Sequence, residues 1–134
     1  ICSKYKKKRC FYFMDNIPNR KYSNAKKSFY IPHDVRLILL IDETFFGSSK
    51  DGLAVCENGI YWHNDILTST KENRLLWEEF IEIKITYKET KVFLGKGNVL
   101  NTTDCKQSTK YVARVLKEIQ KLLKTKYKLA IKKI

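Results

Sequence analysis

The segment Phe45–His63, FFGSSKDGLAVCENGIYWH, decides the fold that the sequence predicts. Two short apolar runs in it, Gly52–Cys56 and Ile60–His63, are separated by Glu57-Asn58-Gly59. An Asn-Gly pair between two such runs favours a type I′ hairpin, because both central residues of that turn need positive φ. The turn would fix the register of the hairpin and give the neighbouring strands a pair to join. The side chains that this register assigns to faces are those of Leu53, Val55, Ile60 and Trp62.

Further strand patterns continue on both sides of this hairpin. Val35–Phe46 is rich in β-branched and aromatic residues, and its apolar run Leu37–Ile41 is typical of a strand covered on both faces. Strict alternation in Ile81–Tyr87 predicts a half-buried strand. Short turns separate the runs, which predicts an antiparallel meander of about seven strands. The other predicted elements are strands at Arg74–Phe80, Ile81–Lys88, Lys91–Leu94 and Val99–Thr103, turns at Glu89-Thr90 and Gly95–Asn98, and an exposed loop at Asn64–Asn73.

Two helices flank the predicted strands. The first, Asn16–Tyr30, has Asn as its cap and Pro18 in its first turn, where no amide donor is needed. The second begins at Thr103 or Asp104 and runs to about Tyr127. Its apolar stripe is expected to close one end of the curled sheet. That stripe consists of Tyr111, Val112, Val115, Leu116, Ile119, Leu122 and Leu123.

These patterns predict a single α+β domain that is mainly β. About seven antiparallel strands curl into a barrel, a C-terminal amphipathic helix closes it, and a short helix precedes it. The length of 134 residues is enough for one domain with a core of its own. We expect the domain to span residues 16–127, after a basic and aromatic flank (1–15) and before a basic tail (128–134) that frays. Because the first residue is Ile, the flank is interpreted as the remnant of a longer chain.

The formal net charge of +13 is carried by the two ends of the chain. Residues 1–33 carry a net +8, residues 34–103 a net −3 and residues 104–134 a net +8. Basic ends favour polyanionic partners, namely nucleic acid, anionic lipid headgroups or an acidic protein surface. The alternative is that a Lys-, Ile- and Asn-rich chain only reflects an AT-rich genome. The candidate binding residues are Lys6, Lys7, Lys8, Arg9, Lys50, Lys117, Lys121 and Lys124.

The four cysteines show none of the short C-x-x-C spacings of zinc or redox sites. Cys56 and Cys105 are interpreted as small apolar fillers. Cys2 and Cys10 flank a basic run, and either pair with each other or bind a metal with ligands upstream. A reduced cytoplasmic protein, at most peripheral to a membrane, fits this usage best. The longest apolar run, Leu37–Ile41, is far shorter than the roughly 18 residues of a membrane span, so no transmembrane segment is predicted.

Three motifs resemble a group of uncharacterised bacterial proteins with a pleckstrin-homology-like domain. They are Ile41–Val55 (IDETFFGSSKDGLAV), Asn58–Trp62 (NGIYW) and Leu76–Phe80 (LWEEF), and the resemblance covers about residues 16–124. It implies seven antiparallel strands followed by one C-terminal helix, but no settled activity. Eukaryotic lipid-binding members of that fold are similar in clamping inositol phosphates with basic residues between the first two strands. The corresponding loop here, Gly47–Gly52, holds only Lys50, which argues against phosphoinositide binding.

No arrangement of residues predicts catalysis, a metal site or a cofactor. His33 and His63 lie far apart in the sequence, and neither accompanies a Ser or Cys in a nucleophile motif. Glu78 and Glu79 would point to opposite faces of a strand. Gly47–Gly52 lacks the G-K-[ST] ending and the following helix of a phosphate-binding loop. We therefore expect a protein that is not an enzyme.

Three binding functions remain. The preferred one is a module that binds a protein or peptide in a groove beside the last helix or the loop Asn64–Asn73, or by strand addition at a sheet edge. The second is peripheral binding to anionic membranes through Lys4–Arg9 and the lysine face of the last helix. The third is nucleic-acid binding through the same ends, with Phe11-Tyr12-Phe13 beside Lys6–Arg9 as stacking residues.

Overall fold

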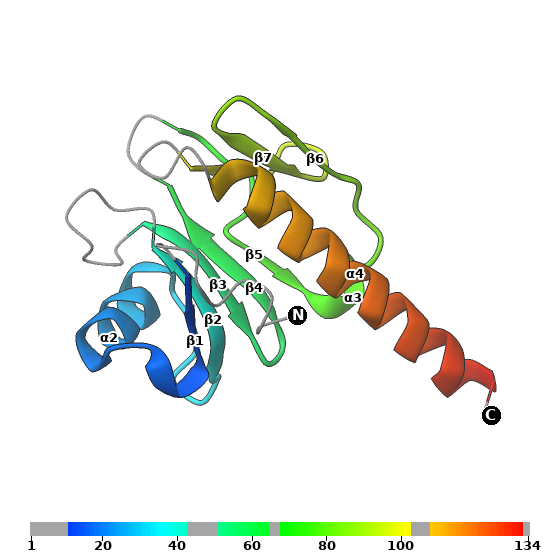
Figure 1. Ribbon diagram of the computed structural model, residues 1–134, viewed down its shortest axis with the longest axis horizontal. Helices are drawn as coiled ribbons and strands as arrows, with labels where there is room; N and C mark the ends of the chain where they lie inside the picture. The colour runs from blue at the N-terminus through cyan, green and yellow to red at the C-terminus, as the bar shows by residue number, and fades with distance from the viewer. Residues whose placement is uncertain (1–10, 43–50, 65–67, 103–107, 133–134) are drawn as a thin grey trace.

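The computed structural model describes residues 11–42, 51–64, 68–102 and 108–132 (Figure 1). These residues form an α+β domain with eight antiparallel strands in two sheets. The strands are β1 (Phe11–Phe13), β2 (Leu37–Asp42), β3 (Gly52–Cys56), β4 (Gly59–His63), β5 (Arg74–Leu76), β6 (Ile85–Lys88), β7 (Lys91–Leu94) and β8 (Val99–Asn101). The helical elements are the 3-10 turn η1 (Met14–Asn16) and the α-helices α2 (Asn19–Ser28), α3 (Trp77–Phe80) and α4 (Ser108–Lys132).

The strands form a five-stranded sheet in the order β1-β2-β3-β4-β5 and a three-stranded sheet in the order β6-β7-β8. Each strand pairs only with its neighbours in the chain, so the predicted antiparallel meander is confirmed. No strand of one sheet pairs with a strand of the other within the described residues. These residues therefore form two open sheets, and the predicted closed barrel is not found among them.

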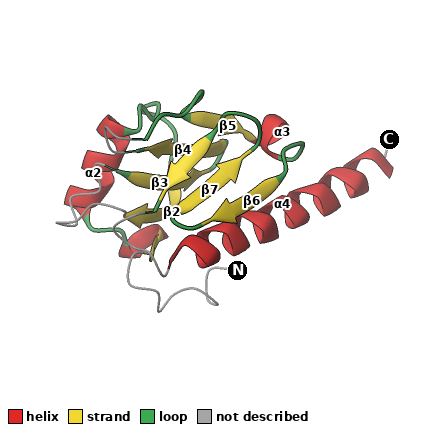
Figure 2. Ribbon diagram, turned by 90° about the horizontal axis from the view of Figure 1, so that it is seen from above, coloured by secondary structure: helices red, strands yellow, loops and turns green. Residues whose placement is uncertain are grey.

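The predicted hairpin forms the middle of the five-stranded sheet. Its register pairs Leu53 with Trp62 and Val55 with Ile60. One face packs against the second sheet and α4 in a shared cluster, and the other face packs against α2 (Figure 2). The side chains on the first face are those of Leu53, Val55, Ile60 and Trp62, as predicted. Those on the second face are Ala54, Cys56 and Tyr61.

The connection of this hairpin differs from the predicted type I′ turn. Neither Asn58 nor Gly59 has a positive φ, and Gly59 is already the first residue of β4. A Cβ on Gly59 would lie 2.8 Å from the Cα of Leu76 and closer still to the carbonyl oxygen of Leu75. Glycine is therefore required here by the close approach of β5, and its conformational freedom is not used.

The first helix is shorter than predicted. Asn16 belongs to η1, and Pro18 occupies the N-cap position of α2. At the other end Tyr30 has a φ of 55°, and the N–H of Ile31 donates to the carbonyl of Lys26 at 3.1 Å. This is a Schellman motif with tyrosine at the position that glycine usually fills. Ala25 and Phe29 are buried against the sheet.

The segment predicted as two strands, Arg74–Phe80 and Ile81–Lys88, has a helical turn in its middle. The strands in it are only β5 and β6, and α3 with the following turn lies between them. The Leu76 N–H donates to Glu79 Oε1 at 3.2 Å, which caps α3. Gln120 Nε2 of α4 donates to the carbonyls of Phe80 at 2.9 Å and Ile83 at 2.7 Å. These tertiary contacts stabilise a helical turn in a sequence whose alternation suggested a strand.

Three boundaries also differ from the prediction. β1 lies inside the segment 1–15 that was assigned to a flank, and it pairs with β2. β2 begins at Leu37, two residues later than expected, and residues 43–46 lie outside the described residues. The predicted start of the last helix, Thr103 or Asp104, also lies outside them. α4 continues to Lys132, beyond its predicted end near Tyr127.

The first half of α4 is an integral part of the core. Val112, Val115 and Leu116 are fully buried in the cluster that both sheets share. Leu122 was predicted to lie in the apolar stripe, but it is 47% exposed. The C-terminal end of the helix extends past both sheets (Figure 1). Ile119 and Leu123 are half-buried and pack against the same cluster, so Leu122 is the member of the predicted stripe that is exposed.

Polar side chains join the two sheets where strand pairing does not. Asn64, directly after β4, is 8% exposed. Its Nδ2 donates to the Val99 carbonyl at 2.7 Å, and its Oδ1 accepts from the Asn101 N–H at 2.8 Å. Thr70 Oγ1 accepts from the Val99 N–H at 3.1 Å. The predicted exposed loop Asn64–Asn73 therefore begins as a buried link that closes the outer edge of β8.

The packing around Gly59 leads to a stability prediction. Gly59→Ala is expected to lower the free energy of unfolding by about 2 kcal/mol or more, because the new Cβ would collide with the backbone of β5. Urea denaturation followed by circular dichroism measures this loss. Gly59→Asn is the matched control, since asparagine suits a type I′ turn but not a close backbone contact. Wild-type stability in Gly59→Asn would contradict the assignment.

Candidate functional site

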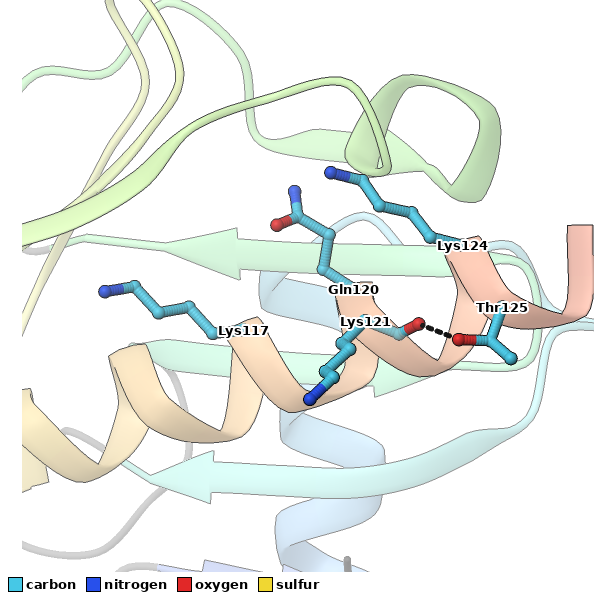
Figure 3. A pocket seen from close by; sticks show the side chains of 5 residues that line it. All are labelled: Lys117, Gln120, Lys121, Lys124 and Thr125. Atoms are coloured by element: carbon cyan, nitrogen blue, oxygen red, sulfur yellow. Dashed lines mark hydrogen bonds between the residues drawn. The ribbon is translucent and has the colours of Figure 1, made fainter. Parts of the chain in front are cut away.

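A basic hollow on the surface of α4 is the candidate functional site (Figure 3). Its volume is about 370 Å³. All of its lining residues lie in the middle of α4, between Lys117 and Thr125. Spacings of three and four residues along an α-helix bring these side chains to one side. The lining residues are Lys117, Gln120, Lys121, Lys124 and Thr125.

Two of the lining side chains are occupied by contacts within the protein. Gln120 bridges the carbonyls of Phe80 and Ile83, and the Thr125 hydroxyl donates to the Lys121 carbonyl at 3.0 Å. The charged groups left to bind a ligand are therefore the ammonium groups of the three lysines. No carboxylate lines the hollow, so the charged side chains in its lining are all positive. This arrangement can bind an anion by charge, but it offers no nucleophile and no general base.

The hollow belongs to a longer basic stripe. Lys110 and Arg114 are exposed and precede Lys117 by seven and three residues, so they lie on the same side of α4. The Arg114 guanidinium lies 5.9 Å from the centre of the Tyr111 ring, which holds it against the helix. The sequence analysis did not select these two residues, although their helical spacing from Lys117 was available. We call Lys110, Arg114, Lys117, Lys121 and Lys124 the α4 basic stripe.

The structure brings together three of the eight candidate binding residues. Lys117, Lys121 and Lys124 line one hollow. The other five, Lys6, Lys7, Lys8, Arg9 and Lys50, lie outside the described residues.

The aromatic residues proposed for base stacking are in the sheet. Phe11 and Phe13 belong to β1 and are only 4% and 8% exposed. Tyr12 is half-buried, and the Lys21 ammonium lies 5.1 Å from its ring centre. A base cannot stack on the two phenylalanines without pulling β1 out of the core.

The residues that were weighed for catalysis, His33, His63, Glu78 and Glu79, all lie in the described part of the chain. His63 Nδ1 lies 2.7 Å from Asp51 Oδ1 at the end of β4, and His33 lies elsewhere. Glu79 is engaged as the cap of α3. Among the residues that the structure describes, no three His, Cys, Asp or Glu side chains are grouped so as to hold a metal ion. No helix in the described ranges is long and apolar enough to cross a membrane.

Comparison with known proteins does not identify a family. No family model matches the chain, and no curated protein or solved structure matches it significantly. The function is therefore argued from the residues of this chain and not from a relative.

The prediction that Cys56 is a small apolar filler is confirmed. Its thiol is fully buried between β3 and α2, where it packs as a small apolar side chain. Burial raises the pKa of this thiol to about 12, because the thiolate would lose its hydration, and nearby Lys26 offsets only part of this effect. The thiol is therefore protonated at every physiological pH.

The raised pKa predicts that Cys56 is inert in the native protein. Iodoacetamide at pH 8.5 is expected to leave the Cys56 peptide unmodified in buffer and to alkylate it fully in guanidinium chloride. Mass spectrometry of the digested protein measures both. The denatured sample is the control for access of the reagent to the thiol. Alkylation in buffer within minutes would contradict the burial of this side chain.

Proposed function

We propose that this chain is a non-enzymatic interaction module that binds an acidic segment of a partner protein on the α4 basic stripe. The observation that carries the proposal is that Lys117, Lys121 and Lys124 line one hollow on α4 whose lining contains no acidic side chain. An acidic segment supplies the charges that these lysines lack within the described structure. Of the two predicted grooves, we therefore prefer the one beside the last helix. The other, at the loop Asn64–Asn73, is less suited to binding, because Asn64 is used to hold β8.

The expected energetics are those of exposed ion pairs. Each exposed pair contributes roughly 0.2 to 1 kcal/mol, so three lysines together supply on the order of 2 kcal/mol. This interaction weakens with salt, because the charges lie at the surface. Electrostatic attraction of this size selects and orients a partner, and further contacts are needed for a stable complex.

The pleckstrin-homology-like resemblance is compatible with such a module. Support comes from the order of elements, since four strands (β2–β5), three strands (β6–β8) and one C-terminal helix follow one another. β1 and α2 are additions before this order begins. The proposal includes a reducing, cytoplasmic location, which is supported by the free thiol of Cys56.

The proposal predicts that the three lysines are needed for binding an acidic peptide. The probe is a fluorescein-labelled peptide of fifteen glutamates, and its binding is measured by fluorescence anisotropy. Replacing Lys117, Lys121 and Lys124 together by alanine is expected to weaken binding about 10-fold at low salt. The wild-type affinity itself should fall as the ionic strength rises.

A matched variant removes the same charge from other surfaces. Lys27, Lys71 and Lys96 are exposed and lie outside α4, so replacing all three by alanine should change the affinity less than 2-fold. If both triple variants lose the same affinity, only the net charge matters, and the proposed site is wrong.

Peripheral binding to anionic membranes is the second candidate function. Leu122 favours it, because this apolar side chain is 47% exposed beside Lys121 on α4. The C-terminal end of α4 extends past the sheets, so the sheets do not obstruct its approach to a lipid surface (Figure 1). Nucleic-acid binding loses its local support, since Phe11 and Phe13 are buried.

The membrane function predicts a specific effect of Leu122. The wild-type protein should co-sediment with vesicles that contain phosphatidylglycerol and not with pure phosphatidylcholine vesicles. Leu122→Asp is expected to lower the partition coefficient about 10-fold, because it removes an apolar contact and adds a negative charge. Ser23→Asp, at an exposed position on α2, adds the same charge elsewhere and should have a smaller effect. Absence of sedimentation at low salt would exclude this function.

A further inference from the structure

Tyr30, which directly follows the C-cap of α2, is the most exposed large apolar side chain among the described residues. It is 78% exposed. Its φ of 55° lies in the left-handed region, where glycine and asparagine are more stable than tyrosine. Exposure of the ring and conformation of the backbone thus both disfavour tyrosine at this position. A residue of this kind points to an interaction with a partner.

The loop that carries Tyr30 is held in place by Lys26 of α2. The Lys26 ammonium donates hydrogen bonds to three backbone carbonyls after Tyr30, those of Pro32 at 2.8 Å, His33 at 3.0 Å and Val35. These bonds fix the chain on the C-terminal side of Tyr30, and α2 fixes it on the other side. The ring is therefore exposed on an ordered support. A partner that binds it has little backbone left to order, which lowers the entropic cost of binding.

α2 adds positive charge next to this ring. Arg20 and Lys27 are exposed and lie two turns apart on one side of the helix, and Lys27 precedes Tyr30 by three residues. α2 contains no Asp or Glu that would neutralise these charges. Lys21 is held by a carboxylate of β2 at 2.7 Å, so it is not available to a ligand. The helix therefore presents two positive charges and, at its C-terminal end, one exposed aromatic ring.

We propose that α2 and Tyr30 form a second binding surface, which takes single-stranded nucleic acid. A base would stack on the Tyr30 ring, and phosphates would pair with Arg20 and Lys27. Aromatic rings beside positive charges bind single strands without reading their sequence. α2 and α4 cover opposite faces of the five-stranded sheet, so this surface is separate from the α4 basic stripe (Figure 2). The inference goes beyond the proposed function and does not rest on it.

The chemistry of this surface favours nucleic acid over other polyanions. An acidic peptide supplies carboxylates but no flat ring to stack on Tyr30. An anionic membrane requires apolar side chains on the exposed side of a helix, and the exposed residues of α2 are polar or charged. They are Asn19, Arg20, Ser23 and Lys27. Residues 11–36 contain five Lys or Arg and two Asp, so this part of the domain is net positive, as a polyanion requires.

The test measures the binding of a fluorescein-labelled oligonucleotide of twelve thymidines by fluorescence anisotropy at low salt. Tyr30→Asn removes the ring and suits the left-handed backbone, so it should weaken binding about 10-fold while the urea midpoint stays equal or rises. Tyr30→Phe keeps the ring and should change the affinity less than 2-fold. Tyr87→Asn removes an exposed tyrosine of β6 as the matched control, and it should also change the affinity less than 2-fold.

A second set of variants tests the charges. Replacing Arg20 and Lys27 together by alanine should lower the slope of log affinity against log salt by about 1.4, because each phosphate contact of a single strand contributes about 0.7. Replacing the three lysines of the α4 hollow by alanine should leave the oligonucleotide affinity within 3-fold of the wild type. The polyglutamate peptide has no bases, so Tyr30→Asn should leave its affinity unchanged.

Each outcome supports or overturns the second surface. The proposal is wrong if the oligonucleotide does not bind at low salt, or if Tyr30→Asn binds it as well as the wild type does. It is also wrong if the α4 variant loses more affinity than the α2 variants, because the nucleic acid then binds the α4 basic stripe. If Tyr30→Asn weakens polyglutamate binding equally, the surface takes acidic protein segments instead. The proposed function is judged separately, by the effect of the α4 variant on the peptide.

Discussion

The structure depends on one sheet that is buried on both faces. Tyr61 and Trp62 are adjacent in β4, point to opposite faces and are both almost fully buried. Fully burying a large apolar side chain contributes roughly 1.5 to 3 kcal/mol, so each of the two covering layers is necessary for the stability of the domain. α2 covers one face, and the second sheet with α4 covers the other (Figure 2). α2, which precedes the central hairpin, and the second sheet with α4, which follow it, are therefore held in place by packing on the two faces of the sheet.

The same packing determines where the positive charge lies. Val112, Val115 and Leu116 fix the rotation of α4 about its own axis, because they must face the shared cluster. The lysines three and four residues away are then directed to solvent, where their charges keep their hydration. Gln120 lies at the boundary and ties the helix to the turn before β6. The position of the basic surface thus follows from the packing of the apolar side of α4 in the core.

Hydrogen bonding explains how the second sheet is joined to the rest of the domain. Asn64 is nearly buried, and both ends of its amide are used to satisfy β8. Leaving those backbone groups unpaired in a buried place would cost about 1 to 3 kcal/mol each. On the other side of this sheet, Gln120 of α4 donates to the carbonyl of Ile83 just before β6, and Ile85 is buried in the shared cluster.

The sequence by itself determined the central hairpin, the faces of Leu53, Val55, Ile60 and Trp62, the turns at Glu89-Thr90 and Gly95–Asn98, and the amphipathic character of the last helix. These features follow from local periodicity and turn chemistry, which need no distant partner. It also identified Lys117, Lys121 and Lys124, because helical spacing alone brings them together.

Only the tertiary structure decided the features that involve distant segments. The alternation Ile81–Tyr87 suggested a strand, but Gln120 of α4 binds the carbonyls of Phe80 and Ile83 and holds the start of this region in a turn. Gly59 was expected to serve a turn, yet β5, which approaches it from later in the chain, is the reason for glycine there. The arrangement as two open sheets depends on Asn64 reaching β8, 35 residues away. Contacts between residues so far apart in the chain leave no periodic signal in the sequence, because they depend on shape and hydrogen bonding formed only when the chain has folded.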